Sequence, residues 1–136
     1  MLALSACQAE PTVTVAGHTF VVEIADDPKS QQLGLMFRDE MADDHGMVFI
    51  FKRSQPRSFW MKNTRIPLDI LYFDEHRRLV SMQTDVRPCR TQQCPGYPSR
   101  KPAKYVLEIN GGLAEQLGIT TGAKMTFSWE EGDSEN

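Results

Sequence analysis

Apolar and polar residues alternate with a period of two along much of the chain, and this pattern predicts β-strands. Phe20, Val22 and Ile24 share one face of a predicted strand over 19–25. The run 47–51 is apolar on both faces, which is typical of a buried strand. The strands predicted from such patterns lie at 13–15, 19–25, 47–51, 57–62, 69–73, 79–83, 105–109 and 125–129.

Helical signals are confined to two short segments. Asp27, Pro28 and Gly34 predict a short helix with an aspartate cap, a proline in the first turn and a glycine stop. A second helical turn is predicted over 113–117, and the proline-rich segment 87–102 is predicted to be a long loop. About eight strands with one or two short helices predict a mainly β domain, folded as a small barrel or a sandwich. Because no strand alternates with a long helix, a parallel α/β sheet is not expected.

Composition and length agree with one globular domain. The chain has 136 residues, of which 40% are hydrophobic and 24% are charged. It contains no repeat of fixed period and no low-complexity segment. We expect a signal remnant and lipid tether over 1–11, a single domain over 12–129 and an acidic tail over 130–136.

The segment Leu4-Ser5-Ala6-Cys7 resembles a bacterial lipobox. This pattern predicts a lipid on Cys7 and places the protein at the membrane, on the periplasmic side of a bacterial cell envelope. The six residues before Cys7 lack a basic start and are shorter than an export signal, so we expect the leader to begin further upstream. The alternative is an ordinary N-terminal strand with a chance cysteine.

Charge is distributed unevenly, although the formal net charge is only -3. That net charge argues against a nucleic-acid partner. The segments 52–68 and 86–107 each contain five basic residues and no acid. Either these are solvated loops balanced by acids elsewhere, or they form a surface for anionic polysaccharide or lipid head groups.

Five motifs, in this order and spacing, resemble the family of domain of unknown function 192; they lie at 33–38, 46–49, 59–64, 66–70 and 105–112. The resemblance covers residues 12–128. It implies a small β-rich domain that is often exported, and it implies no activity. The chain departs from the family at 75–78, where members often have a tighter turn containing glycine.

Asp69 lies in a predicted strand that is apolar on both faces, so its carboxylate is expected to be buried and to need a partner. The candidate partners are Arg38, Lys62, Arg65 and the backbone amides of 63–64. Two interpretations stay open. Asp69 is either a ligand-binding carboxylate in a cleft or a structural anchor that holds a turn against the strand.

Trp60 and Lys62 share a face of one predicted strand, and Asn63 follows them. An aromatic ring beside a cation and an amide is a frequent arrangement in sugar and anion sites, although the same trio also suits a strand end. The candidate ligand-binding residues are Arg38, Trp60, Lys62, Asn63, Arg65 and Asp69.

Cys89 and Cys94 are predicted to form a disulfide, because no histidine near them supports a zinc site and an exported protein favours oxidation. Met41, His45 and Met47 form the best candidate metal cluster, but methionine in apolar runs is usually core filler. We therefore expect no metal and no cofactor.

The sequence contains no nucleophile elbow, no zinc-protease motif and no phosphate loop, so no catalytic residue is assigned. The leading hypothesis is a binding module for an anionic or sugar-containing envelope component. One alternative is a small hydrolase that uses Asp69 or Glu108, by analogy with paired carboxylates in glycosidases. Another is a structural partner in an envelope assembly, and the oligomeric state stays open.

Overall fold

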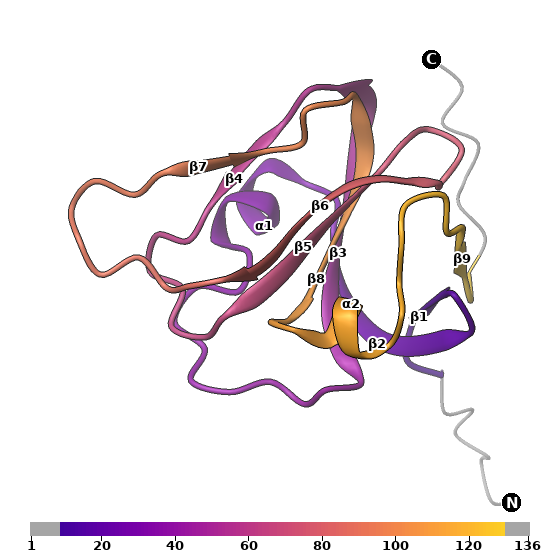
Figure 1. Ribbon diagram of the computed structural model, residues 1–136, viewed down its shortest axis with the longest axis horizontal. Helices are drawn as coiled ribbons and strands as arrows, with labels where there is room; N and C mark the ends of the chain where they lie inside the picture. The colour runs from indigo at the N-terminus through magenta and orange to yellow at the C-terminus, as the bar shows by residue number, and fades with distance from the viewer. Residues whose placement is uncertain (1–8, 130–136) are drawn as a thin grey trace, which may run out of the picture.

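The computed structural model describes residues 9–129. Within that range the chain forms nine strands and two short helices (Figure 1). In chain order they are β1 (Thr12–Val15), β2 (His18–Ala25), α1 (Pro28–Leu33), β3 (His45–Gln55), β4 (Ser58–Trp60), β5 (Leu68–Phe73), β6 (Leu79–Val86), β7 (Gly96–Pro98), β8 (Ala103–Asn110), α2 (Leu113–Gln116) and β9 (Met125–Phe127). Among the described residues, no helix is long and apolar enough to cross a membrane.

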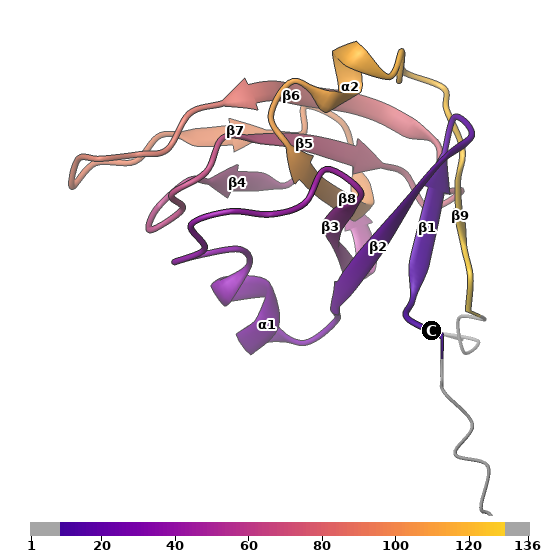
Figure 2. The same cartoon turned by 90° about the horizontal axis from the view of Figure 1, so that it is seen from below.

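Seven strands form one curled sheet in the order β6-β5-β8-β3-β2-β1-β9 (Figure 2). Its neighbouring strands are antiparallel except β2 and β3, which run parallel because α1 lies in the connection between them. An isolated bridge between Arg78 and Lys124 joins the β5–β6 turn to the start of β9. The sheet is therefore a half-barrel, and the mainly β class predicted from the sequence is confirmed.

The two faces of this sheet carry separate hydrophobic cores. Tyr105, Leu107 and Ile109 of β8 pack into the inner core with residues of β1, β2, β9 and α2. Val106, between them, faces an outer core that includes Met61 and residues of β3 and β5. The strands β4 and β7 form a second, two-stranded sheet, and Phe59 of β4 and Tyr97 of β7 pack against this outer core. Burial on both faces explains why 47–51 and 105–109 lack strict alternation.

The short helix α1 forms as its sequence predicts. The Asp27 carboxylate accepts a hydrogen bond from the backbone N–H of Ser30 at 2.8 Å, and Pro28 occupies the first helical position. Gly34 follows the helix with a φ of 49°, a left-handed conformation that favours glycine. The helix therefore ends where the chain must turn back toward the sheet.

The loop predicted over 87–102 is only partly a loop, because it contains β7. β7 pairs with β4, so Tyr97 lies opposite Phe59. Pro98 is tolerated in β7 because both strands of a two-stranded sheet are edge strands, in which some backbone N–H groups point away from the partner strand. This pairing also brings the two basic segments of the sequence side by side.

The turn over 74–78 lacks the glycine that is frequent in the family. The Asp74 carboxylate accepts hydrogen bonds from the backbone N–H groups of His76 and Arg78, at 2.8 and 3.0 Å. Arg77 takes the left-handed position, with a φ of 63°. An aspartate side chain that binds the backbone thus supports a turn that glycine would otherwise make easy.

Candidate functional site

A cavity of about 330 Å³ lies between α1, β3, β4 and β8, on the outer face of the sheet. Its lining combines eight apolar or aromatic side chains with five polar ones. The lining residues are Pro28, Gln31, Gln32, Leu33, Gly34, Leu35, Met36, Phe49, Phe51, Ser58, Phe59, Trp60, Thr64 and Glu108. Concave apolar sites with a few polar groups are the usual form of small-molecule sites.

Glu108 is the only ionisable residue in this lining, as far as the structure describes the chain. It lies on β8 opposite Met47 of β3 and Ile70 of β5, and only 4% of its surface is exposed. No described residue donates a hydrogen bond to its carboxyl group. Burial raises the pKa of Glu108 from 4.5 to about 8, so the group is mostly a neutral acid at pH 7.

The walls around Glu108 are formed by rings that contact one another edge to face. The Phe59 ring lies 4.9 Å from that of Phe49, 6.3 Å from that of Phe51 and 5.9 Å from that of Tyr72, between centroids. Burial, and in second place the charge of Glu108, raises the pKa of Tyr72, whose hydroxyl donates to the Tyr97 carbonyl. These mutual contacts hold the rings in fixed orientations and keep the cavity open.

Trp60 and Lys62 form the mouth of the cavity. The Lys62 Nζ lies 5.0 Å from the Trp60 ring centroid, and 42% of Trp60 is exposed. A second groove of about 460 Å³ shares Gln32, Leu33, Met36 and Trp60 with the cavity and adds Lys29, Lys62 and Asn63. The trio of Trp60, Lys62 and Asn63 chosen from the sequence therefore does converge, at the mouth of the cavity.

The two arginines of the predicted site lie elsewhere. The guanidinium group of Arg38 forms a bidentate salt bridge with the carboxylate of Glu23 of β2, at 2.5 and 2.8 Å. Arg38 lines a separate groove. Arg65 bonds Asp39 at 3.0 Å and lies over the Phe37 ring. Neither arginine lines the cavity that contains Glu108.

Arg57 is a further cation that the structure uses internally. Its guanidinium group lies 3.6 Å from the centroid of the Phe51 ring and donates hydrogen bonds to the carbonyls of Ala103 and Arg53. Arg57 therefore braces the back of the aromatic wall. Of the basic residues in the segment 52–68, only Lys62 lines the groove at the cavity mouth.

Asp69 is fully buried, as the sequence predicts, but its predicted partners are wrong. The carboxylate accepts hydrogen bonds from the backbone N–H groups of Asp85 at 2.7 Å, Gly112 at 2.9 Å and Ala114 at 2.8 Å. It thus ties β5 to the end of β6 and to the start of α2. Three short backbone contacts are the pattern of a structural clasp.

Asp69 and Glu108 do not form a catalytic pair. Asp69 lies opposite Ile109 on β8, whereas Glu108 lies opposite Ile70 on β5. Neighbouring residues of a strand point to opposite faces, so the two carboxyl groups lie on different sides of the sheet. The arrangement that a glycosidase needs, with both carboxyls flanking one bond, is therefore absent from this pair.

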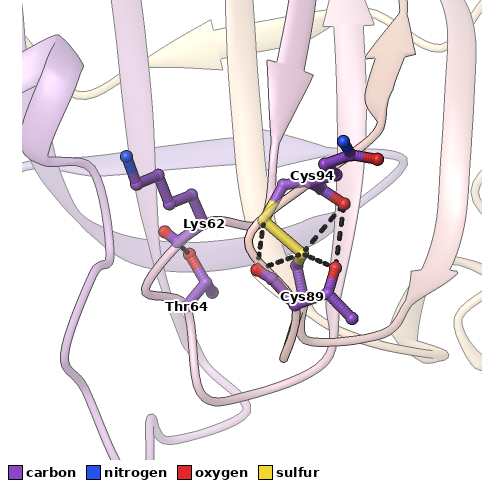
Figure 3. Close-up of a disulfide and its surroundings, with 6 residues drawn as sticks. Lys62, Thr64, Cys89 and Cys94 are labelled. Carbon is purple, nitrogen blue, oxygen red and sulfur yellow. Dashed lines mark hydrogen bonds between the residues drawn. A yellow bond between two sulfur atoms is a disulfide. The ribbon is translucent and has the colours of Figure 1, made fainter.

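The structure contains the predicted disulfide between Cys89 and Cys94 (Figure 3). Figure 3 shows it beside the turn formed by Lys62 and Thr64. A shallow groove between them is lined by Asn63, Thr64, Arg65, Pro88, Cys89 and Arg90. Within residues 9–129, no group of three or more metal-binding side chains comes together, and Cys7 lies outside the described residues.

The sequence analysis did not include Glu108 among the ligand-binding residues. One signal was available, since Glu108 is a lone acid in the apolar run 105–109. A buried acid in such a run is either paired or functional. Only the folded structure shows that Asp69 has donors and that Glu108 has none among the described residues.

Comparison with known proteins gives a consistent result over the whole fold. The sequence profile of DUF192, described as uncharacterised ACR, matches residues 11–127. A UPF0127 protein of Pyrococcus abyssi is 30% identical over 112 residues, which cover 78% of this chain and 85% of that protein.

Two crystal structures are also similar to this chain. A protein of unknown function from Novosphingobium aromaticivorans DSM 12444 has a TM-score of 0.79 and 40% identity, over 85% of this chain and 83% of its own. A protein of Sinorhizobium meliloti 1021, described as a candidate transcription regulator, has a TM-score of 0.77 and 35% identity, over 87% and 92% of the two chains.

Proposed function

The chain belongs to the DUF192 family, and from the geometry of its site we propose that it is a binding module for a sugar-containing, anionic component of the bacterial cell envelope. The observation that carries this proposal is the cavity in which Glu108 is buried without a hydrogen-bond donor among the described residues. A largely buried polar group that lines a cavity and lacks a protein donor gains from a ligand that bonds to it.

The three parts of the site suit three parts of such a ligand. The exposed Trp60 ring offers an apolar face on which a sugar ring can stack. Lys62 and Lys29 line the same groove and provide positive charge for a phosphate or carboxylate. Glu108 provides a polar group at the inner end, and the volume of about 330 Å³ is within the range of small-molecule sites.

The place of action is part of the proposal. We propose that Cys7 carries a lipid anchor and that the protein works on the periplasmic side of the envelope, because 4–7 resembles a lipobox. Metabolic labelling with a fatty acid tests this in the bacterium. Wild type should incorporate label and Cys7→Ser should not, whereas equal label in both would remove the anchor from the proposal.

Binding is tested by titrating the purified domain with glucose 6-phosphate and following tryptophan fluorescence. Trp129 is replaced by phenylalanine in all variants, so that Trp60 is the only reporter. We expect saturable quenching, weakened about tenfold or more by Lys62→Ala. Lys124→Ala is the matched control, because Lys124 is exposed outside the site. No saturable change with any sugar phosphate would contradict the proposed function.

The exposed apolar residues support one alternative function, the binding of a protein partner. The exposed large hydrophobic residues of the described chain are Leu33, Phe37 and Trp60, and all three lie near the cavity mouth. Such a patch would also suit a protein partner in an envelope assembly. If the sugar titrations fail while Leu33→Ser with Phe37→Ser disrupts a complex recovered from cells, the assembly role takes precedence.

A further inference from the structure

The floor and the mouth of the site have opposite electrostatic character. Glu108 is the sole ionisable group in the described lining of the cavity, which contains no lysine, arginine or histidine. The adjoining groove at the mouth has the reverse composition, with Lys29 and Lys62 and no acid. A ligand that spans both parts therefore meets an acid at its inner end and cations at its outer end.

Resting on the function proposed above, we propose that the ligand carries a cationic amino group that enters the cavity and pairs with the carboxylate of Glu108. The ligand class is then an amino sugar that also bears a phosphate or carboxylate. Its anionic group remains at the mouth with Lys62 and Lys29. A sugar phosphate without the amino group would leave the carboxyl group of Glu108 without a charged partner.

The free energy of binding favours an amino group over a hydroxyl at the inner end of the cavity, beside Glu108. Burying an ion pair is often unfavourable, because both charges lose water. Here only 4% of Glu108 is exposed, so folding has already displaced most of the water around its carboxyl group. The remaining costs are the desolvation of the incoming ammonium and the ionisation of the acid. The surrounding rings of Phe49, Phe59 and Trp60 lower the cost of desolvation, because aromatic faces attract cations.

Cations already pack against two aromatic rings of the cavity lining. Arg57 covers one face of Phe51 at 3.6 Å, and Lys62 lies 5.0 Å from the Trp60 ring. Both cations contact rings that line the cavity, but neither enters it. The cavity side of the same rings is the place where a ligand ammonium would make the equivalent contact.

The proton balance of binding gives this proposal a distinctive signature. Below pH 7 the free Glu108 is a neutral acid, because burial raises its pKa to about 8. An ammonium partner stabilises the carboxylate, so Glu108 loses its proton to the solvent while the ligand amino group keeps its own. The other titratable groups around the cavity are Tyr72, and Lys29 and Lys62 at its mouth.

The experiment is isothermal titration of the purified domain at pH 6.5, in two buffers of different ionisation enthalpy. The probes are glucosamine 6-phosphate, N-acetylglucosamine 6-phosphate, in which the amine is uncharged, and glucose 6-phosphate, which lacks it. We expect glucosamine 6-phosphate to bind about tenfold or more tightly than the other two and to release close to one proton per site. The other two should release only the fraction of a proton that ionisation of their phosphate contributes, which is common to all three probes.

The variant Glu108→Gln keeps the size of the side chain and removes its charge. It should abolish the proton release that belongs to Glu108 and the advantage of the amine, so that glucosamine 6-phosphate and glucose 6-phosphate bind the variant with affinities within about twofold of each other. Glu115→Gln, at an exposed position of α2, is the control. Equal affinity of all three probes would overturn the amino-group proposal and leave the proposed function standing. No binding of any probe would overturn both.

Discussion

Asp69 and Glu108 are acidic residues at neighbouring positions of two paired strands, and the fold treats them in opposite ways. Asp69 points into the inner side of the sheet, where three backbone N–H groups bind its carboxylate. Glu108 points to the outer side, where its lining contains rings and no described donor. The first carboxyl group therefore has three backbone donors, whereas burial raises the pKa of the second to about 8.

The difference in hydrogen bonding indicates different roles for these two acids of the same sheet. A fully bonded buried carboxylate has no acceptor capacity to spare for a ligand, and its loss would leave backbone donors without partners. A largely buried acid without a protein donor costs free energy in the unliganded protein, and a ligand that bonds to it can recover part of that cost. The comparison therefore assigns Asp69 to the stability of the fold and Glu108 to the site.

The largest effect is expected from Asp69→Ala. The change removes the acceptor of the N–H groups of Asp85, Gly112 and Ala114, of which the first two are partly buried and the third is buried. It should lower the free energy of unfolding by about 3–5 kcal/mol. Chemical denaturation followed by circular dichroism measures it. Asp26→Ala, at an exposed position, should cost under about 0.5 kcal/mol. A similar midpoint for both variants would end the structural assignment of Asp69.

Through Glu108, the free energy of unfolding should fall as pH rises, which is opposite to the effect of an acid whose pKa is lowered on folding. Its pKa in the folded state is raised from 4.5 to about 8, so the folded protein holds this proton more tightly than the unfolded chain. Its contribution to stability is therefore complete below pH 4.5 and is lost as pH rises to about 8. Within that window the loss amounts to at most about 1.4 kcal/mol per pH unit.

The measurement is the difference between wild type and Glu108→Gln in denaturation series from pH 4 to pH 9. Because all other titrating groups are common to both proteins, they cancel in the difference. The free energy of unfolding of wild type should fall relative to the variant as pH rises. Parallel curves would mean that Glu108 is not held neutral by burial.

Removal of the disulfide should have a smaller effect, confined to the region beside the site. The double change Cys89→Ala with Cys94→Ala opens a loop of about six residues, for which the chain-entropy model gives about 2 kcal/mol. The pH difference attributed to Glu108 should persist in this variant, because neither cysteine lines its cavity. If that difference disappeared with the disulfide, the loop would have to be part of the site.

The smallest effect on stability is expected from Lys62→Ala. An exposed contact of Lys62 with the Trp60 ring contributes about 0.5–1 kcal/mol at most. Its effect on binding should be the larger one, since Lys62 lines the groove proposed for the anionic group. A loss of stability as large as that of Asp69→Ala would place Lys62 in the structural framework instead.

Much of the fold follows from local patterns that the sequence states directly. Alternation over 19–25 and the apolar runs at 47–51 and 105–109 give strands that the structure contains. Asp27, Pro28 and Gly34 set the limits of α1. These features depend on neighbours within a few residues, because backbone conformation and capping are local interactions.

The sequence by itself also determined that Asp69 is buried, that Cys89 and Cys94 are near enough to join, and that Trp60, Lys62 and Asn63 share a surface. The burial of Asp69 follows from the periodicity of its strand. The other two conclusions follow from short separations along the chain. The sequence alone did not determine the role of either buried carboxyl group.

Only the tertiary structure decided which acid receives donors and which does not. The amides that bind Asp69 come from positions 16, 43 and 45 residues away. The cavity beside Glu108 forms only when α1, β3 and β4, which precede it in the chain, pack against β8. Such contacts depend on which distant segments the fold brings together, and no local pattern encodes that choice. For this reason, of two acids in equally apolar strands, Asp69 stabilises the fold and Glu108 lines the candidate site.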